Sequence, residues 1–167
     1  MKGSTNTNRF RVFQIRWKEK LGYPENPYLI RWTIILFGYS IRLHHWLRSD
    51  DCRFFHDHSS NLLSIVLYGH YWNVKPAIIN KDPTFGERKF RTEGIFNSWK
   101  NILNLRKSVW FSKATEQHYL SIPKTGAWTL LFEGRPYRKW GFWVNEHKWR
   151  PLRYFSKYGI IQDENYQ

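Results

Sequence analysis

Short runs of β-branched and aromatic residues, separated by turn signals, are the feature that most constrains how this chain can fold. The runs cover 28–37, 39–47, 61–68, 71–74, 105–111, 118–122, 127–132 and 137–144. β-Branched and aromatic side chains suit a pleated sheet, and short strands with turns about every 8–12 residues are typical of sandwiches and barrels. The spacing therefore predicts an all-β fold in which the first two runs form a hairpin around Gly38.

Both ends of the chain carry a different pattern. Phe10, Phe13 and Trp17 are spaced by three and four residues, so we predict a short amphipathic helix over 9–22. A second helix is predicted over 149–161, docked on the outside of the barrel.

The middle of the chain contains one segment with weak strand signals. Residues 80–101 mix Pro and Gly with charged residues, and we interpret them as an excursion from the barrel, either a β-hairpin or a lid. No internal repeat and no low-complexity linker is present. We therefore interpret 1–167 as a single domain, with 1–22 as an N-terminal extension.

The chain is strongly basic, with 27 Lys and Arg residues against 13 Asp and Glu residues and a formal net charge of +14. Such a charge concentrates anions near the protein, so nucleic acid, nucleotides, phosphorylated metabolites and anionic membranes are candidate partners. The alternative is that the charge only keeps an aromatic-rich protein in solution. The basic residues lie among aromatic residues, which argues against a disordered basic tail.

The sequence also argues against several classes of protein. Cys52 is the only cysteine, so neither an internal disulfide nor a cysteine-rich zinc site can form. The N-terminal residues lack the apolar core of a signal peptide, and the longest apolar stretch, 33–39, is too short to span a bilayer. We therefore expect a cytoplasmic protein with no membrane partner. No P-loop, GxGxxG, HExxH or GxSxG motif is present.

The histidines suggest a metal site. His56 and His58 form an HxH pair, and alternate residues of a strand point to the same face, so both imidazoles can reach one ion. His118 begins a later predicted strand and is the candidate third ligand. Imidazole suits Zn, Fe, Cu and Ni. An HxH pair alone is a weak signal, because many such pairs are ordinary surface histidines.

The arrangement of an HxH pair, a strand ending at Gly69 and a later histidine resembles the cupin superfamily. More narrowly, the chain resembles a group of uncharacterised bacterial and phage cupin-like proteins. The stretches that carry this likeness are 43–51, 56–58, 64–69, 128–134 and 138–143, within a span of roughly 28–155. The resemblance implies a small double-stranded β-helix, or jelly-roll, barrel with short peripheral helices. It also implies one metal ion held by the three histidines, and a bacterial or phage-infected host cell as the location.

One position departs from the cupin pattern. That pattern places a glutamate four or five residues after the second histidine, where this chain has Leu62 and Leu63. Asn61 precedes them and is interpreted as a weak ligand, a water-positioning group or a hydrogen-bonding partner of the substrate. We therefore predict a three-histidine site with open coordination positions, as a catalytic metal requires. The expected ion is Fe, Zn, Mn or Ni.

One predicted strand face carries a cation, an imidazole and an aromatic ring. Arg42, His44 and Trp46 share this face under strict alternation, so they are candidates to line the barrel interior. We predict that Arg42 and Trp46 bind substrate and that His44 is catalytic, since an imidazole exchanges protons near neutral pH. The alternatives are that Trp46 is core, that Arg42 pairs with an acid such as Asp50 or Asp51, and that His44 only supports a ligand imidazole.

Further substrate-binding candidates are cationic or aromatic. They are Arg48, Arg53, Tyr68 and Arg138. Arginine pairs with anionic groups through a bidentate fork, and aromatic faces beside arginine commonly hold bases.

These features favour a metal-dependent enzyme that acts on a small anionic molecule, phosphorylated or nucleotide-like. They do not separate an oxygenase from an isomerase or a phosphate-ester hydrolase. The first alternative is a non-catalytic module that binds and sequesters a nucleotide. The second is a nucleic-acid-binding accessory protein, and a homodimer is compatible with all three.

Overall fold

The fold is built almost entirely from antiparallel strands. The computed structural model describes residues 12–49, 54–78, 85–144 and 147–158. Its strands are β1 (Phe13–Tyr23), β2 (Asn26–Leu36), β3 (Tyr39–Trp46), β4 (Leu62–Ile78), β5 (Phe85–Glu93), β6 (Val109–Ser112), β7 (Tyr119–Ser121), β8 (Ala127–Glu133), β9 (Phe142–Val144) and β10 (His147–Trp149). Its helices are α1 (Trp99–Leu103), α2 (Pro151–Tyr158) and the single-turn 3-10 helices Ile95–Asn97 and Leu105–Lys107. This confirms the predicted all-β class with short helices.

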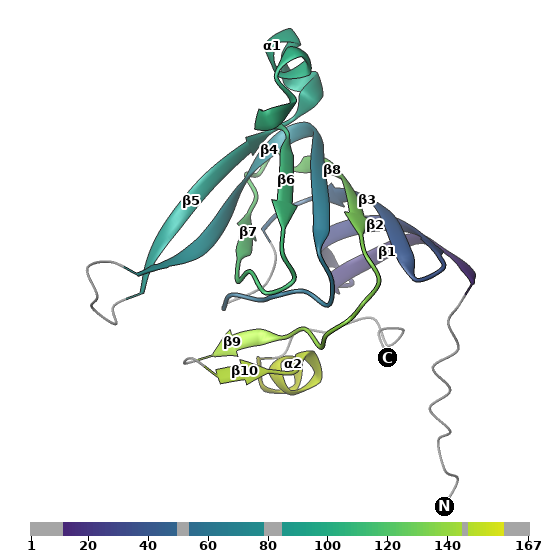
Figure 1. The fold of residues 1–167 in the computed structure, drawn as a ribbon, viewed down its shortest axis with the longest axis vertical. Coiled ribbons are helices and arrows are strands. Elements are labelled where there is room, and N and C mark those ends of the chain that lie inside the picture. Colours follow the sequence, from purple (N-terminus) through teal and green to yellow (C-terminus); the bar gives the residue numbers. More distant parts are fainter. Residues whose placement is uncertain (1–11, 50–53, 79–84, 145–146, 159–167) are drawn as a thin grey trace, which may run out of the picture.

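The main sheet runs in the order β1-β2-β3-β8-β4-β5, and β6 and β7 also pair with β4. β9 and β10 form a separate two-stranded sheet. Figure 1 shows β4, β5 and β6 converging near α1 and spreading apart at the other end, beyond which β9, β10 and α2 lie. The predicted hairpin is present as β2 and β3, which pair along their length from Leu29↔Trp46 to Leu36↔Tyr39.

Strand β4 organises both halves of the barrel. Its first part pairs with β6 and β8, and its second part pairs with β5 and β7. A register irregularity between Val66 and Tyr68 precedes Gly69, which has a φ of +78°. A Cβ at Gly69 would lie 2.5 Å from the Gly126 carbonyl oxygen, so only glycine permits this close crossing of the two backbones.

Two hydrophobic clusters stabilise the ends of the barrel. The barrel cluster consists of Leu29, Trp46, Val66, Tyr71, Ile122 and Ala127. The second cluster joins α2 to the small sheet, because the Tyr154 ring stacks on the Phe142 ring at a centroid distance of 3.8 Å. The helix predicted over 149–161 is therefore present over Pro151–Tyr158, and it contributes a fully buried residue to this cluster.

The helix predicted over 9–22 is wrong, since the described part of that segment is strand β1. The spacing of Phe13 and Trp17 fits a strand face as well as a helix face, because both are odd-numbered. Pairing with β2 decides between them, and the Glu19 carboxylate on β1 accepts a hydrogen bond from Arg31 Nε on β2 at 2.7 Å. The Phe13 and Trp17 side chains stay largely exposed.

Other segments also differ from their predicted bounds, and the runs 61–68 and 71–74 form the single strand β4. The run 105–111 contains a 3-10 turn before β6, and only the end of the run 137–144 is a strand. The described part of 80–101 contains β5, paired along its length with β4, followed by short helices. None of the helices in the described part of the chain is long and apolar enough to cross a membrane.

Candidate metal centre

Three histidines from two distant segments meet at the open end of the barrel. The backbone N–H of His56 donates to the carbonyl of His118, and the reverse bond is also present, both at 2.9 Å. This isolated bridge puts the two residues opposite each other, although the HxH segment does not form the regular strand that was predicted. The His58 N–H donates to the Ala114 carbonyl at 3.0 Å, which holds the second HxH imidazole beside the first.

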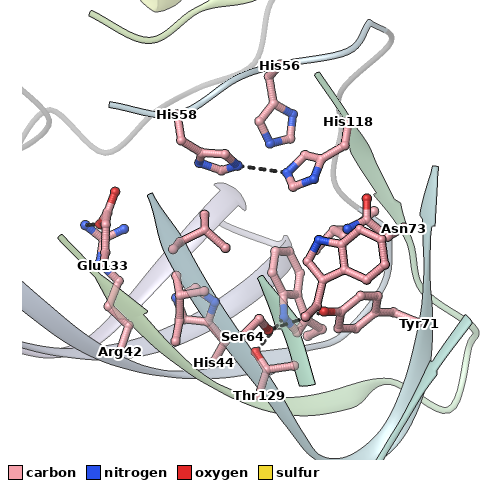
Figure 2. Close-up of a pocket in the computed structure, with 15 residues that line it drawn as sticks. Arg42, His44, His56, His58, Ser64, Tyr71, Asn73, His118, Thr129 and Glu133 are labelled. Carbon is pink, nitrogen blue, oxygen red and sulfur yellow. Dashed lines mark hydrogen bonds and ion pairs between the residues drawn. The ribbon is translucent and has the colours of Figure 1, made fainter. Parts of the chain in front are cut away.

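The three imidazoles converge on one point (Figure 2). One ring nitrogen from each lies within 4.8 Å of the others, and His58 Nε2 is 2.8 Å from His118 Nε2. The group formed by His56, His58 and His118 can hold a metal ion. We call it the histidine triad.

Burial keeps the triad in the form that metals bind. Desolvation lowers the pKa of His56 to about 4, with Asp57 opposing the shift. Desolvation and the neighbouring histidines also lower the pKa values of His58 and His118 well below the usual range. All three imidazoles are therefore neutral near pH 7, and neutral imidazole is the ligand form. The donor set fits a transition metal that accepts nitrogen ligands.

Asp57, between the two HxH histidines, ties the triad to the small sheet. Its side chain is fully buried, and Oδ1 accepts from the Gly141 N–H at 2.8 Å. Oδ2 accepts from Trp143 Nε1 at 3.3 Å and forms ion pairs with Arg138 at 2.9 Å and Lys148 at 2.7 Å. Sequence reasoning missed this role, although strand-like alternation already places Asp57 on the side opposite the two imidazoles.

A cavity of about 130 Å³ lies directly under the triad. It is lined by Arg42, His44, Trp46, His56, His58, Leu62, Ser64, Tyr71, Asn73, Trp110, His118, Leu120, Thr129, Leu131 and Glu133. We call it the inner cavity. A second cavity of about 200 Å³, the outer cavity, shares Arg42, His56, His58 and Glu133 with it.

The predicted inward face of β3 does point into the inner cavity. Arg42, His44 and Trp46 all line it, while His45 lies on the other face and stacks on Trp128 at 4.2 Å. Arg42 forms an ion pair with Glu133 of β8, whereas the acids considered from sequence lie outside the described residues. Trp46 belongs to the barrel core, and its Nε1 donates to Thr129 Oγ1 at 3.1 Å.

His44 is buried, and its Nε2 has no hydrogen-bond partner within the described structure. Desolvation lowers its pKa well below the usual range, and the nearby charges of Arg42 and Arg31 lower it further. Its imidazole is therefore neutral near pH 7.

Four predicted site residues within the described structure, Asn61, Arg48, Tyr68 and Arg138, line neither cavity. The Asn61 amide oxygen accepts from the Ala114 N–H at 2.9 Å and from the Tyr137 hydroxyl at 3.1 Å. Arg48 donates to Asn26, and Tyr68 is 59% exposed.

Arg138 and Arg53 need separate description. The Arg138 guanidinium lies behind the triad, where it pairs with Asp57 and donates to the carbonyls of His58 and Ala114. Arg53 lies outside the described residues.

No protein-family model and no curated protein sequence matches this chain. Its structure is similar to solved structures of cupin-fold proteins. Hydroxypropylphosphonic acid epoxidase from S. wedmorenis has a TM-score of 0.43 at 12% identity, over 72% of this chain and 59% of that one. Oxalate decarboxylase from Lactobacillus farciminis has a TM-score of 0.44 at 13% identity, over 78% and 32%. The 7S globulin of Momordica charantia has a TM-score of 0.47 at 10% identity, over 80% and 36%. This chain thus spans less than two thirds of each of those proteins, and a likeness this distant carries no information about activity.

Proposed function

We propose that the protein is a single-domain, cupin-type, metal-dependent enzyme that acts on a small anionic molecule in the inner cavity. The observation that carries this proposal is the position of the histidine triad, whose neutral imidazoles converge on one side of the inner cavity. A bound divalent ion supplies Lewis-acid or redox chemistry at such a place.

The charges around the inner cavity favour an anionic substrate. The triad contains no carboxylate, and Glu133, the acid among the lining residues, is paired with Arg42 and accepts a hydrogen bond from Ser40. The charge of a divalent ion would therefore not be neutralised by its ligands. An anionic group of the substrate provides that neutralisation, which is needed most where water is excluded.

The size of the two cavities sets the size of the substrate. The inner cavity, at about 130 Å³, is close to the roughly 150 Å³ of an apolar cavity that admits benzene. A larger molecule, such as a nucleotide, would place one end in the inner cavity and extend past the shared side chains into the outer cavity, which Arg31 and Trp140 also line.

Two residues of the chain, Arg42 and His44, have different roles toward the substrate in this proposal. Arg42, held by Glu133, provides a fixed cation where the two cavities meet. His44, with a free Nε2, offers a hydrogen bond or a proton acceptor to a molecule in the inner cavity. Replacing His44 with Gln should abolish turnover and leave metal content and folding intact. Loss of metal together with activity would assign it a supporting role instead.

The first experiment measures metal content. Full-length protein is loaded with Fe²⁺, Zn²⁺, Mn²⁺ or Ni²⁺, desalted and analysed for bound metal. We expect one ion per chain in the wild type and in His147→Ala, a matched control because His147 is an exposed histidine of β10. His58→Ala should weaken binding by more than the about 10- to 100-fold that follows loss of a residue which only supports a ligand. A wild type that retains no stoichiometric metal would contradict the proposal.

The second experiment tests substrate charge with metal-loaded protein. Thermal-shift measurements compare small carboxylates, sugar phosphates and nucleotides with neutral sugars. We expect stabilisation by anions that weakens in His58→Ala. Stabilisation by neutral compounds alone would refute the anionic assignment, and binding without any turnover of the stabilising compound would favour a sequestering module.

A further inference from the structure

Asn73 of β4 is a buried polar side chain whose hydrogen-bonding capacity the protein leaves unused. It is fully buried, it lines the inner cavity, and neither its Oδ1 nor its Nδ2 has a partner within the described structure. Strand β4 is paired on both sides at this position, with Phe90 of β5 and Leu120 of β7, so the side chain has a fixed direction. Buried amides without partners are rare in folded proteins.

The side chains around Asn73 in the described structure do not supply hydrogen-bond partners for its amide group. The Tyr71 hydroxyl, two residues earlier, donates to Ser64 Oγ at 3.3 Å, so this group is engaged elsewhere. The Trp110 indole N–H also lines the inner cavity and is also buried without a partner. Figure 2 shows Asn73 beside Tyr71 and across the cavity from Arg42 and Glu133. One wall of the cavity therefore presents an unpaired acceptor and unpaired donors.

We infer that this wall binds the amide or lactam edge of a planar ligand. A carboxamide side chain offers an acceptor oxygen next to a donor NH₂, and its complement is a group that offers a donor next to an acceptor. Amides and ring lactams have this arrangement, and the Trp110 N–H can donate to the second lone pair of their carbonyl oxygen. A carboxylate offers acceptors only and would leave Asn73 Oδ1 unpaired. The flanking rings of Tyr71 and Trp110 suit a flat group.

This inference rests on the proposed function, because it adds a second end to the same ligand. The anionic end belongs near the triad and Arg42, and the neutral amide end belongs near Asn73. The ligand class is therefore a small planar amide or lactam that also carries an acidic group.

The test compares two probes in which one hydrogen-bond donor is either present or replaced by a methyl group. 2-Pyridone carries adjacent C=O and N–H groups, and N-methyl-2-pyridone lacks the N–H. Calorimetric titration of full-length protein, with and without Zn²⁺, should show 2-pyridone binding about 10-fold tighter, the usual effect of one neutral hydrogen bond. Asn73→Leu should lose this preference. Asn104→Leu, a matched change at an exposed asparagine outside both cavities, should retain it.

The outcomes separate this inference from the proposed function. Equal affinity for the two probes, no binding of 2-pyridone, or an undiminished preference in folded Asn73→Leu overturns the inference. The comparison of the two probes on the wild-type protein needs no variant, so the inference can be tested even if Asn73→Leu does not fold. Preference for 2-pyridone in protein that binds no metal supports the inference and refutes the proposed function, and stoichiometric metal without preference does the reverse.

Discussion

Asp57 and Asn73 are both fully buried, and their surroundings are opposite in kind. Both oxygens of Asp57 are occupied by backbone, indole and cationic donors, whereas both polar atoms of Asn73 lack partners in the described structure. A buried polar group that is fully paired specifies structure, and one left unpaired lowers stability unless a ligand completes it. Near the triad, Asp57 therefore stabilises the fold, whereas Asn73 does so only if a bound molecule completes its hydrogen bonds.

The largest loss in the free energy of unfolding is expected for Asp57, the residue whose polar atoms are all paired. Asp57→Ala leaves the Gly141 and Trp143 N–H groups without their acceptor and Arg138 without its counter-ion, so we expect a loss of about 3 kcal/mol in the free energy of unfolding. Urea denaturation of metal-free protein measures it. Asp57→Asn, which keeps an acceptor but not the charge, should lose less. A loss for Asp57→Ala under about 1 kcal/mol, the size of one ordinary hydrogen bond, would contradict the structural role.

Acid should weaken the fold through the unpaired imidazoles. The pKa of buried His44 lies well below its usual value, so below about pH 6.5 the unfolded imidazole binds a proton that the folded one does not. The contribution of neutral His44 to the free energy of unfolding is therefore fully present above about pH 6.5 and decreases as the pH falls. For His44 alone the slope approaches about 1.4 kcal/mol per pH unit between its unfolded and folded pKa values.

The measurement is urea denaturation of metal-free protein at several pH values from 7 to 5. His44→Gln should show a shallower decline than the wild type by the contribution of one proton. His147→Ala, which removes an exposed histidine, should follow the wild type. Identical slopes for the wild type and His44→Gln would show that burial does not exclude the proton.

A smaller difference in the free energy of unfolding is expected between variants of two buried asparagines, Asn73 and Asn101. Asn73→Leu removes an unpaired amide, so stability should be unchanged or higher by up to about 1 kcal/mol. Asn101 is also buried, but its Nδ2 donates to the Gly94 carbonyl at 3.1 Å, so Asn101→Leu should cost about 1–2 kcal/mol. Thermal and urea unfolding of both variants provide the comparison. Equal losses at the two sites would mean that Asn73 has partners within the protein.

The smallest effect is expected at the outer surface of the same strand. Tyr68 of β4 is 59% exposed and lines neither cavity, so Tyr68→Ala should change the free energy of unfolding by less than about 0.5 kcal/mol. Urea denaturation against the wild type tests this. A larger loss would show that the Tyr68 ring makes stabilising contacts despite its exposure.

Much of the barrel could be predicted because its signals are local. The hairpin of β2 and β3 follows from two β-branched runs around Gly38, and the placement of Arg42, His44 and Trp46 on one face follows from simple alternation. The same applies to the histidines, since a spacing of two brings both HxH imidazoles to one side.

The remaining features depend on partners that alternation cannot reveal. The apolar spacing in β1 suits a helix and a strand equally, and only its pairing with β2 decides. Glu133, as the partner of Arg42, becomes visible once β8 lies beside β3. Asn73 was missed because a register irregularity in β4 changes which residues face inward, and no sequence pattern marked it.

That irregularity has a consequence for how this chain can change length. Leu62 and Ser64 face the inner cavity before it, and Tyr71 and Asn73 face the same cavity after it, so the inward positions change from even to odd numbers. Straightening β4 between Val66 and Gly69 without changing its length would turn Tyr71 and Asn73 outward, whereas removing one residue there would restore unbroken alternation and keep both facing the cavity. The length of this short stretch and its irregularity can therefore change together without reversing the cavity wall, but neither can change alone. A related chain that is one residue shorter between these positions should have a regular strand here and the same two residues facing the cavity.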